Sequence, residues 1–212
     1  MRLNEERIAI DGPVGAIEMI VENPGAPRGI ALICHPHPLF GGANTNKVAQ
    51  TLARTFARMD YVALRPNFRG VGSSAGTHDE GRGETEDMLA VLADAKCRYG
   101  DLPVALAGFS FGAFVQTRVA RALAEANHPA QRLVLVGTAA GFVEGTRSYD
   151  TEAVPGDTIV IHGSADETVP LANVLAWAEP LELPVVVVPG ADHFFHRRLH
   201  VIREIVTRAW RH

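Results

Sequence analysis

The residues with the clearest chemical potential form the run Gly108-Phe109-Ser110-Phe111-Gly112. An apolar, strand-like stretch precedes this run and a helix-like stretch follows it, which is the setting of a nucleophile elbow. A serine hydroxyl is a useful nucleophile only when it is exposed above its neighbours and lies within hydrogen-bond distance of a general base. The two glycines leave room for the backbone of such a tight turn. The pattern predicts Ser110 as the nucleophile of an acyl-transfer reaction.

Two later loops carry the partners that such a serine needs. A Gly-x-Ser-x-Gly pattern also arises by chance, so these partners decide whether it marks a catalytic serine. On a sheet of this kind the triad residues follow the order serine, acid, histidine, and the acid and the histidine each come after a later strand. The apolar run 158–161 leads into a loop that contains Asp166, and the β-branched run 184–188 leads into a loop that contains His193. We therefore predict that Asp166 orients His193 and that His193 takes the proton of Ser110.

Two carboxylates compete with Asp166 for the orienting role. Glu167 lies beside it on the same loop, and Asp192 directly precedes His193. Adjacent residues on a turn rarely point their side chains together, which argues against Asp192. Glu167 is the closer rival.

The loop at 34–42, which reads Cys-His-Pro-His-Pro-Leu-Phe-Gly-Gly, follows a predicted strand and is the second chemical feature. On a sheet of this kind, the oxyanion of an acyl-transfer reaction is bound by backbone N–H groups of such a loop and of the residue after the nucleophile, here Phe111. The prolines of the loop have no N–H to give. The second donor is therefore one of three residues, His37, Leu39 or Phe40. We prefer His37, because the His-Pro pair before it matches the His-Gly pair that often precedes this donor.

Aromatic residues surround the predicted site in the sequence. Most large apolar side chains belong to the core, and those that face the cleft would form an apolar pocket for the acyl or alcohol group. The residues that we predict to line this pocket are Phe40, Phe109 and Phe194.

The elements that must position these residues follow from apolar periodicity. We predict strands at about 5–10, 15–22, 29–34, 60–65, 103–108, 132–138, 158–163 and 184–188, and helices at 46–59, 84–99, 111–125, 170–179 and 197–211. From the third strand onward strands alternate with helices, which predicts a mostly parallel sheet of about eight strands with helices on both faces. The first two strands lack an intervening helix and predict an antiparallel edge hairpin. The loops at 66–83 and 139–157 are too short for a lid domain, so residues 1–212 form one predicted domain.

Composition limits the classes of partner. The net charge is −4 and the pI about 6.1, which gives no basic surface for nucleic acid. No signal sequence and no apolar stretch of membrane-spanning length is found, so we expect a cytoplasmic protein. Cys34 and Cys97 are expected to stay reduced. No metal or organic cofactor is required by the predicted chemistry, and the exposed sheet edge or the last helix could build a homodimer.

In the motifs quoted above the chain resembles the small, lidless predicted hydrolases of the α/β-hydrolase superfamily. Further motifs of the resemblance lie at 46–48, 65–74, 162–170 and 190–196, and it extends from about residue 30 to the end of the chain. The resemblance implies the α/β-hydrolase fold, a triad of Ser110, Asp166 and His193, and hydrolysis of carboxylic esters. We expect short-chain esters, because a site without a lid should be shallow and open.

Other interpretations stay open. His35, His37, His193, His196 and His200 could form a metal cluster, although spacing fixes no third ligand. The glycine-rich stretch 70–76 lacks the helix that a phosphate-binding loop opens, so we expect a rim loop there. A dehalogenase would carry a carboxylate at the elbow. A non-catalytic binding or scaffold protein of the same fold is the main alternative to an enzyme.

Overall fold

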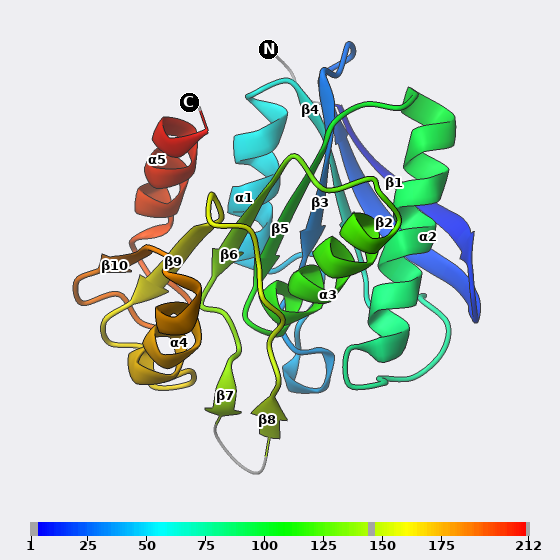
Figure 1. Cartoon of the computed structure of the whole chain (residues 1–212). Helices are drawn as coiled ribbons and strands as arrows, with labels where there is room; N and C mark the ends of the chain where they lie inside the picture. The colour runs from blue at the N-terminus through cyan, green and yellow to red at the C-terminus, as the bar shows by residue number, and fades with distance from the viewer. Residues whose placement is uncertain (1–3, 144–146, 211–212) are drawn as a thin grey trace.

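The computed structural model describes residues 4–143 and 147–210. Its centre is an eight-stranded sheet in the order β1-β2-β4-β3-β5-β6-β9-β10 (Figure 1). The strands are β1 (Asn4–Gly12), β2 (Gly15–Asn23), β3 (Gly29–Cys34), β4 (Tyr61–Pro66), β5 (Val104–Phe109), β6 (Arg132–Val136), β9 (Ile159–Gly163) and β10 (Val185–Val188). The first two strands form an antiparallel hairpin, β2 pairs antiparallel with β4, and the remaining pairings are parallel. The predicted sheet and its edge hairpin are confirmed.

Within the described ranges five α-helices cover the sheet, and each lies within about two residues of its predicted bounds. They are α1 (Lys47–Ala57), α2 (Arg82–Tyr99), α3 (Phe111–Glu125), α4 (Leu171–Ala178) and α5 (Leu199–Ala209). Helices α1 and α5 pack on one face, and α2 and α3 pack on the other (Figure 1). Short 3-10 turns lie at Pro38–Phe40 and Glu179–Leu181. Helices on both faces of the sheet are therefore confirmed.

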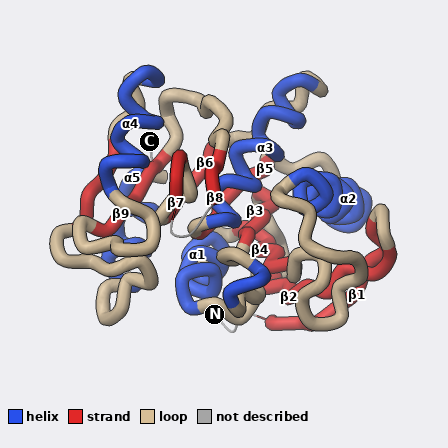
Figure 2. The backbone as a smooth tube through the Cα atoms, turned by 90° about the horizontal axis from the view of Figure 1, so that it is seen from below, coloured by secondary structure: helices blue, strands red, loops and turns tan. Residues whose placement is uncertain are grey.

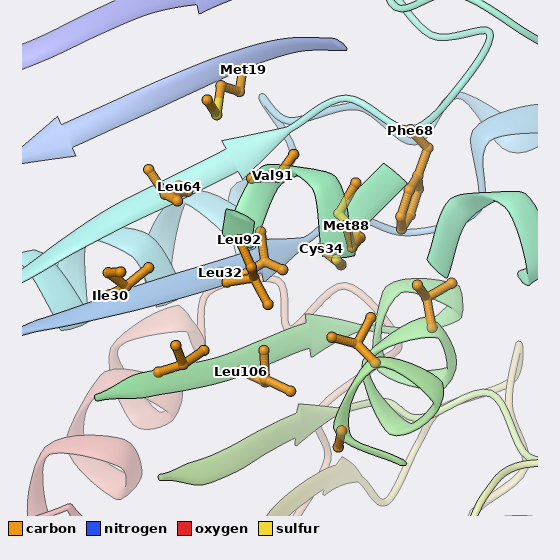
Figure 3. Packing of buried hydrophobic residues seen from close by; sticks show 14 of the residues in the cluster. Met19, Ile30, Leu32, Cys34, Leu64, Phe68, Met88, Val91, Leu92 and Leu106 are labelled. Atoms are coloured by element: carbon orange, nitrogen blue, oxygen red, sulfur yellow. The ribbon is translucent and has the colours of Figure 1, made fainter. Parts of the chain in front are cut away.

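The buried strands divide their side chains between two cores because successive residues point to opposite faces of a sheet. Leu32 and Leu106 pack with Met88 and Leu92 of α2 in the core that Figure 3 shows. Ile33 and its neighbours on that face pack under α1 and α5. Such burial on both sides explains why these strands read as continuous apolar runs rather than as alternating ones.

The segment 139–157 was predicted as a loop, and that prediction was wrong in part. It contains a small antiparallel hairpin of β7 (Gly141–Val143) and β8 (Arg147–Tyr149), which lies near the carboxyl ends of the parallel strands (Figure 2). Three-residue strands are too short to show a periodic pattern in the sequence. The hairpin matters because it supplies part of the wall of the candidate site.

The order of the strands decides where a site can form. The chain passes from β3 to β4 on one side and then returns to place β5 on the other side of β3. Ligands of open α/β sheets bind at such a reversal, beyond the carboxyl ends of the strands. The loop after β3 and the turn after β5 are therefore brought to the same point.

A buried ion pair fixes the segment between this loop and α1. Arg65 Nη2 donates to Glu22 Oε1 at 2.7 Å, Arg65 Nη1 donates to the Asn44 carbonyl at 2.7 Å, and both charged side chains are buried. Burial raises the pKa of Glu22, although the neighbouring guanidinium opposes that rise. The pair thus holds the 34–46 segment against the sheet, and its carboxylate depends on Arg65 for compensation.

Arg65→Met is expected to lower the free energy of unfolding by about 3–5 kcal/mol, because it leaves the Glu22 carboxylate buried without its counter-charge. Replacing both partners with apolar residues removes that uncompensated charge. The double variant Arg65→Met/Glu22→Met is therefore expected to recover most of the loss, as measured by urea denaturation. Equal losses in the single and double variants would contradict this account.

Candidate functional site

Ser110 occupies a strained turn between β5 and α3. Its backbone lies at φ 56° and ψ −119°, a conformation that non-glycine residues rarely adopt. A Cβ on Gly108 would clash with the Gly112 carbonyl, and one on Gly112 would clash with the Cys34 carbonyl. The two glycines thus let α3 begin directly against the ends of its own strand and of β3. The elbow geometry expected from the sequence is present.

The Ser110 hydroxyl begins a chain of hydrogen bonds to two side chains from later loops. His193 Nε2 lies 3.1 Å from Ser110 Oγ, and His193 Nδ1 lies 2.8 Å from Asp166 Oδ2. All three side chains are buried. The structure therefore brings together the three residues that the sequence singled out, which lie at the carboxyl ends of β5, β9 and β10. This arrangement can move a proton from the hydroxyl to the imidazole while the carboxylate holds the ring.

The Asp166 carboxylate is itself held in place by backbone donors. Its Oδ1 accepts hydrogen bonds from the N–H groups of Thr168, at 3.0 Å, and Val169, at 2.8 Å. Behind it, the buried His162 donates from Nε2 to the Val169 carbonyl at 3.0 Å, and burial lowers the pKa of this imidazole. A neutral ring adds no positive charge to the carboxylate. Asp166 therefore keeps one oxygen on its own loop and turns the other toward His193 Nδ1.

The two rival carboxylates point elsewhere. Asp192 Oδ2 lies 2.6 Å from His196 Nδ1, and Glu167 is exposed to solvent.

Among the residues that the structure describes, no three His, Cys, Asp or Glu side chains lie together as metal ligands would.

The backbone N–H groups of Phe111, directly after Ser110, and of His37, on the loop after β3, have no acceptor in the described part of the chain. The other candidates in the loop are engaged, because the Leu39 N–H donates to His37 Nδ1 at 3.3 Å and the Phe40 N–H donates to the His37 carbonyl at 3.2 Å. Of the three loop donors considered, the geometry thus favours His37 and disfavours Leu39.

His35 holds the loop after β3 against the segment that follows β4. Its Nδ1 donates to the Pro36 carbonyl at 2.7 Å, and its Nε2 accepts from the Phe68 N–H at 3.0 Å, so the ring is neutral. Burial lowers the pKa of His35 from 6.5 to about 4. Burial likewise lowers the pKa of His37 to about 4, with the nearby His78 and Arg147 adding to the effect.

Acid is therefore expected to destabilise the protein through His35. A histidine with a folded-state pKa below its unfolded value contributes its full stability above pH 6.5, and that contribution is lost as the pH falls toward 4. The shift corresponds to a loss of roughly 3 kcal/mol over this range. Chemical denaturation at several pH values would measure it. His35→Gln should remove this part of the dependence and leave the part due to His37, whereas His128→Gln, which changes an exposed histidine, should leave the whole dependence unaltered.

A cavity of about 610 Å³ opens at the serine. It is lined by Ser110 and His193 together with Pro36, His37, Phe40, Gly41, Gly42, Asn46, Arg147, Thr168 and Phe194. Of the three aromatic residues predicted to line the pocket, Phe40 and Phe194 do so, and both have exposed rings. Phe109 does not, because its side chain is fully buried in the core and packs 4.8 Å from the His193 ring.

Arg147 is a site residue that the sequence did not reveal. It begins β8, and its guanidinium carbon lies 4.2 Å from the centre of the Phe40 ring at the cavity wall. By contrast, the Arg69 guanidinium is engaged with helix α2, where it forms two hydrogen bonds of 2.8 Å with Asp87. Cys34 and Cys97 are free, the first buried and the second exposed.

Comparison with known proteins places these features in context. Residues 25–155 match the family model of serine aminopeptidase, S33. An α/β serine hydrolase homologue from Coxiella burnetii is 39% identical, with a TM-score of 0.83 and 98% of each chain covered. XC6422 from Xanthomonas campestris, described as an α/β serine hydrolase without lid, is 34% identical, with a TM-score of 0.86 over 100% of this chain and 95% of its own. The uncharacterized protein RP471 of Rickettsia prowazekii is 34% identical over 89% of this chain and 82% of its own length. No helix in the described ranges is long and apolar enough to cross a bilayer.

Proposed function

The chain belongs to the serine aminopeptidase S33 family and has the α/β-hydrolase fold of serine hydrolases, and from that premise we propose that it hydrolyses carboxylic esters of small or short-chain acyl groups. The observation that supports the proposal most directly is the hydrogen-bonded series Ser110, His193 and Asp166 at the floor of an open cavity. In this proposal the three residues act as nucleophile, general base and orienting carboxylate.

The reaction begins with attack of Ser110 Oγ on the acyl carbonyl. His193 Nε2 takes the hydroxyl proton, and the Asp166 carboxylate stabilises the imidazolium that forms. The proton then passes to the alcohol oxygen as the ester bond breaks, which leaves the acyl group on Ser110. Water enters, gives its proton to His193, and releases the acid in a second cycle of the same steps.

The negative charge of the tetrahedral intermediate needs fixed donors close to Ser110. In the proposal these are the N–H groups of Phe111 and His37, which find no acceptor among the described residues. Donors that are held in place before the reaction stabilise the oxyanion without a cost of reorganisation. The loop prolines and the buried His35 ring contribute by holding the His37 peptide in position.

The size of the cavity supports the proposed substrate class. A volume of about 610 Å³ accommodates a small ligand. Phe40 and Phe194 give the entrance an apolar surface. A short acyl chain or a small alcohol could rest on these rings while the carbonyl reaches Ser110.

Covalent labelling tests the proposal. A fluorophosphonate is expected to add once to the wild-type protein and not to Ser110→Ala, as read from the intact mass. The untreated wild-type protein should also hydrolyse para-nitrophenyl butyrate, with an amide analogue as the comparison for peptidase activity, and labelling should abolish that hydrolysis. Equal labelling of both proteins, or none, would remove the enzyme proposal and favour the alternative of a non-catalytic binding protein.

A further inference from the structure

A second cavity of about 580 Å³ adjoins the one at the serine. His37, Phe40 and Arg147 line both cavities and form the boundary between them. Phe111, the residue after Ser110, also lines the second cavity. A substrate whose carbonyl sits at Ser110 could therefore extend a chain past this boundary into the second cavity.

Aromatic rings form one wall of this second cavity. The Phe111 and Phe114 rings lie 5.9 Å apart, and the Tyr149 ring packs 5.1 Å from Phe114 and 6.2 Å from Phe111. Burial raises the pKa of Tyr149, so its hydroxyl is uncharged near neutral pH. This wall suits the apolar part of a ligand.

Arg118 brings a positive charge to the far end of that wall. It lies on α3, eight residues after Ser110, and its guanidinium carbon is 5.7 Å from the centre of the Phe114 ring. Among the described residues, its buried Nε has no hydrogen-bond partner and its guanidinium forms no ion pair. An arginine that lines a cavity without a counter-charge among the described residues suits a carboxylate ligand, which binds guanidinium N–H groups through charge-assisted hydrogen bonds.

None of the described carboxylates around the cavity forms an ion pair with Arg118. The carboxylates Glu80 and Asp150 line the rim and are exposed, and Glu80 lies 3.9 Å from Arg82 instead. Burial keeps the pKa of His37 at about 4, so this ring is neutral near pH 7. Positive charge in the second cavity therefore comes from arginine, with Arg147 on the side nearer to the serine.

We propose that the second cavity binds a carboxylate at the far end of the substrate's acyl chain, so that the protein, beside short-chain esters, also accepts half-esters of medium-length dicarboxylic acids. The inference rests on the proposed function of the Ser110 site. Eight residues of helix rise by roughly 12 Å, and an arginine side chain leans back toward the helix N-terminus. This spacing suits a chain of about the length of a suberyl group. Hydrolysis would transfer the carboxyacyl group to Ser110 Oγ, release the alcohol with the proton from His193, and use one water to free the dicarboxylate.

Two ester probes that differ only at the far end of the chain test this proposal kinetically. These are mono-para-nitrophenyl suberate, which ends in a carboxylate, and para-nitrophenyl octanoate, which ends in a methyl group. Arg118→Met is expected to lower the ratio of their kcat/KM values by about tenfold to a hundredfold, in line with the loss of one charge-assisted hydrogen bond. Arg121→Met is the matched control, because Arg121 lies on the same helix and pairs with Glu125 and Glu152 outside the cavity; its ratio should equal that of the wild type.

Binding to the inert Ser110→Ala protein separates this proposal from the proposed function. Calorimetric titration with methyl hydrogen suberate should give a Kd at least tenfold tighter for Ser110→Ala than for Ser110→Ala/Arg118→Met. Equal affinities, or equal losses of activity on both esters, would overturn the carboxylate site. If the wild-type protein cleaved no ester, the proposed function would fail, whereas the titration would still decide whether Arg118 binds a carboxylate.

Discussion

Replacing Ser110 with alanine is expected to lower kcat for a short-chain ester by about a million-fold. The proposed reaction depends on the bond from Ser110 Oγ to the acyl carbon, and no other hydroxyl lies within hydrogen-bond distance of His193 Nε2 among the described residues. Stopped assays on para-nitrophenyl butyrate with high enzyme concentration would measure the residual rate. A loss of only a few fold would show that the hydroxyl is not the nucleophile.

The strained backbone at this position offers an internal control for folding. Alanine has a Cβ and keeps the strain of φ 56°, whereas glycine adopts this conformation freely. The free energy of unfolding of Ser110→Gly is therefore expected to exceed that of Ser110→Ala by about 1 kcal/mol or more. Both variants should be inactive. Loss of activity together with an unchanged or increased stability would separate the missing nucleophile from damage to the fold.

Much of the fold was predictable because its signals are local. The parallel strands are buried on both faces, so they appear as short apolar runs, and the helices between them show a period of 3.6 residues. The elbow is equally local, since Gly108, Ser110 and Gly112 stand between one strand and one helix. Once the strand order is known, the carboxyl ends of parallel strands meet at one edge, which brings the loops of Asp166 and His193 to the serine.

The features that the sequence did not reveal depend on packing between distant segments. Phe109 is the last residue of β5 and shares a face with Ala105 and Ala107, so its ring enters the core under α1 rather than the pocket. The direction of a single ring at the end of a strand follows from the neighbouring layers. Arg118 and Arg147 line the same cavity because the β7–β8 hairpin lies beside α3. No short-range sequence pattern predicts that contact.

Replacing Asp166 with asparagine is expected to lower kcat/KM by about ten-thousandfold near neutral pH. The N–H groups of Thr168 and Val169 both point at Oδ1, so they would hold the amide oxygen there and turn its NH2 group toward His193 Nδ1. A donor at that point favours the tautomer with the proton on Nε2. In that tautomer the nitrogen next to Ser110 Oγ cannot accept the hydroxyl proton.

The neighbouring carboxylates supply matched controls for this assignment. Asp192→Asn alters a side chain that pairs with the exposed His196, and Glu167→Gln alters an exposed side chain on the same loop as Asp166. Both are expected to stay within about twofold of wild-type kcat/KM, because exposed ion pairs and exposed side chains contribute little. A large loss in either control with a small one in Asp166→Asn would transfer the orienting role to that carboxylate. The asparagine variant should also fold as stably as the wild type to within about 1 kcal/mol, since its amide oxygen still accepts both backbone hydrogen bonds. The predicted loss of activity therefore arises from the position of one proton on His193 and not from a disordered loop.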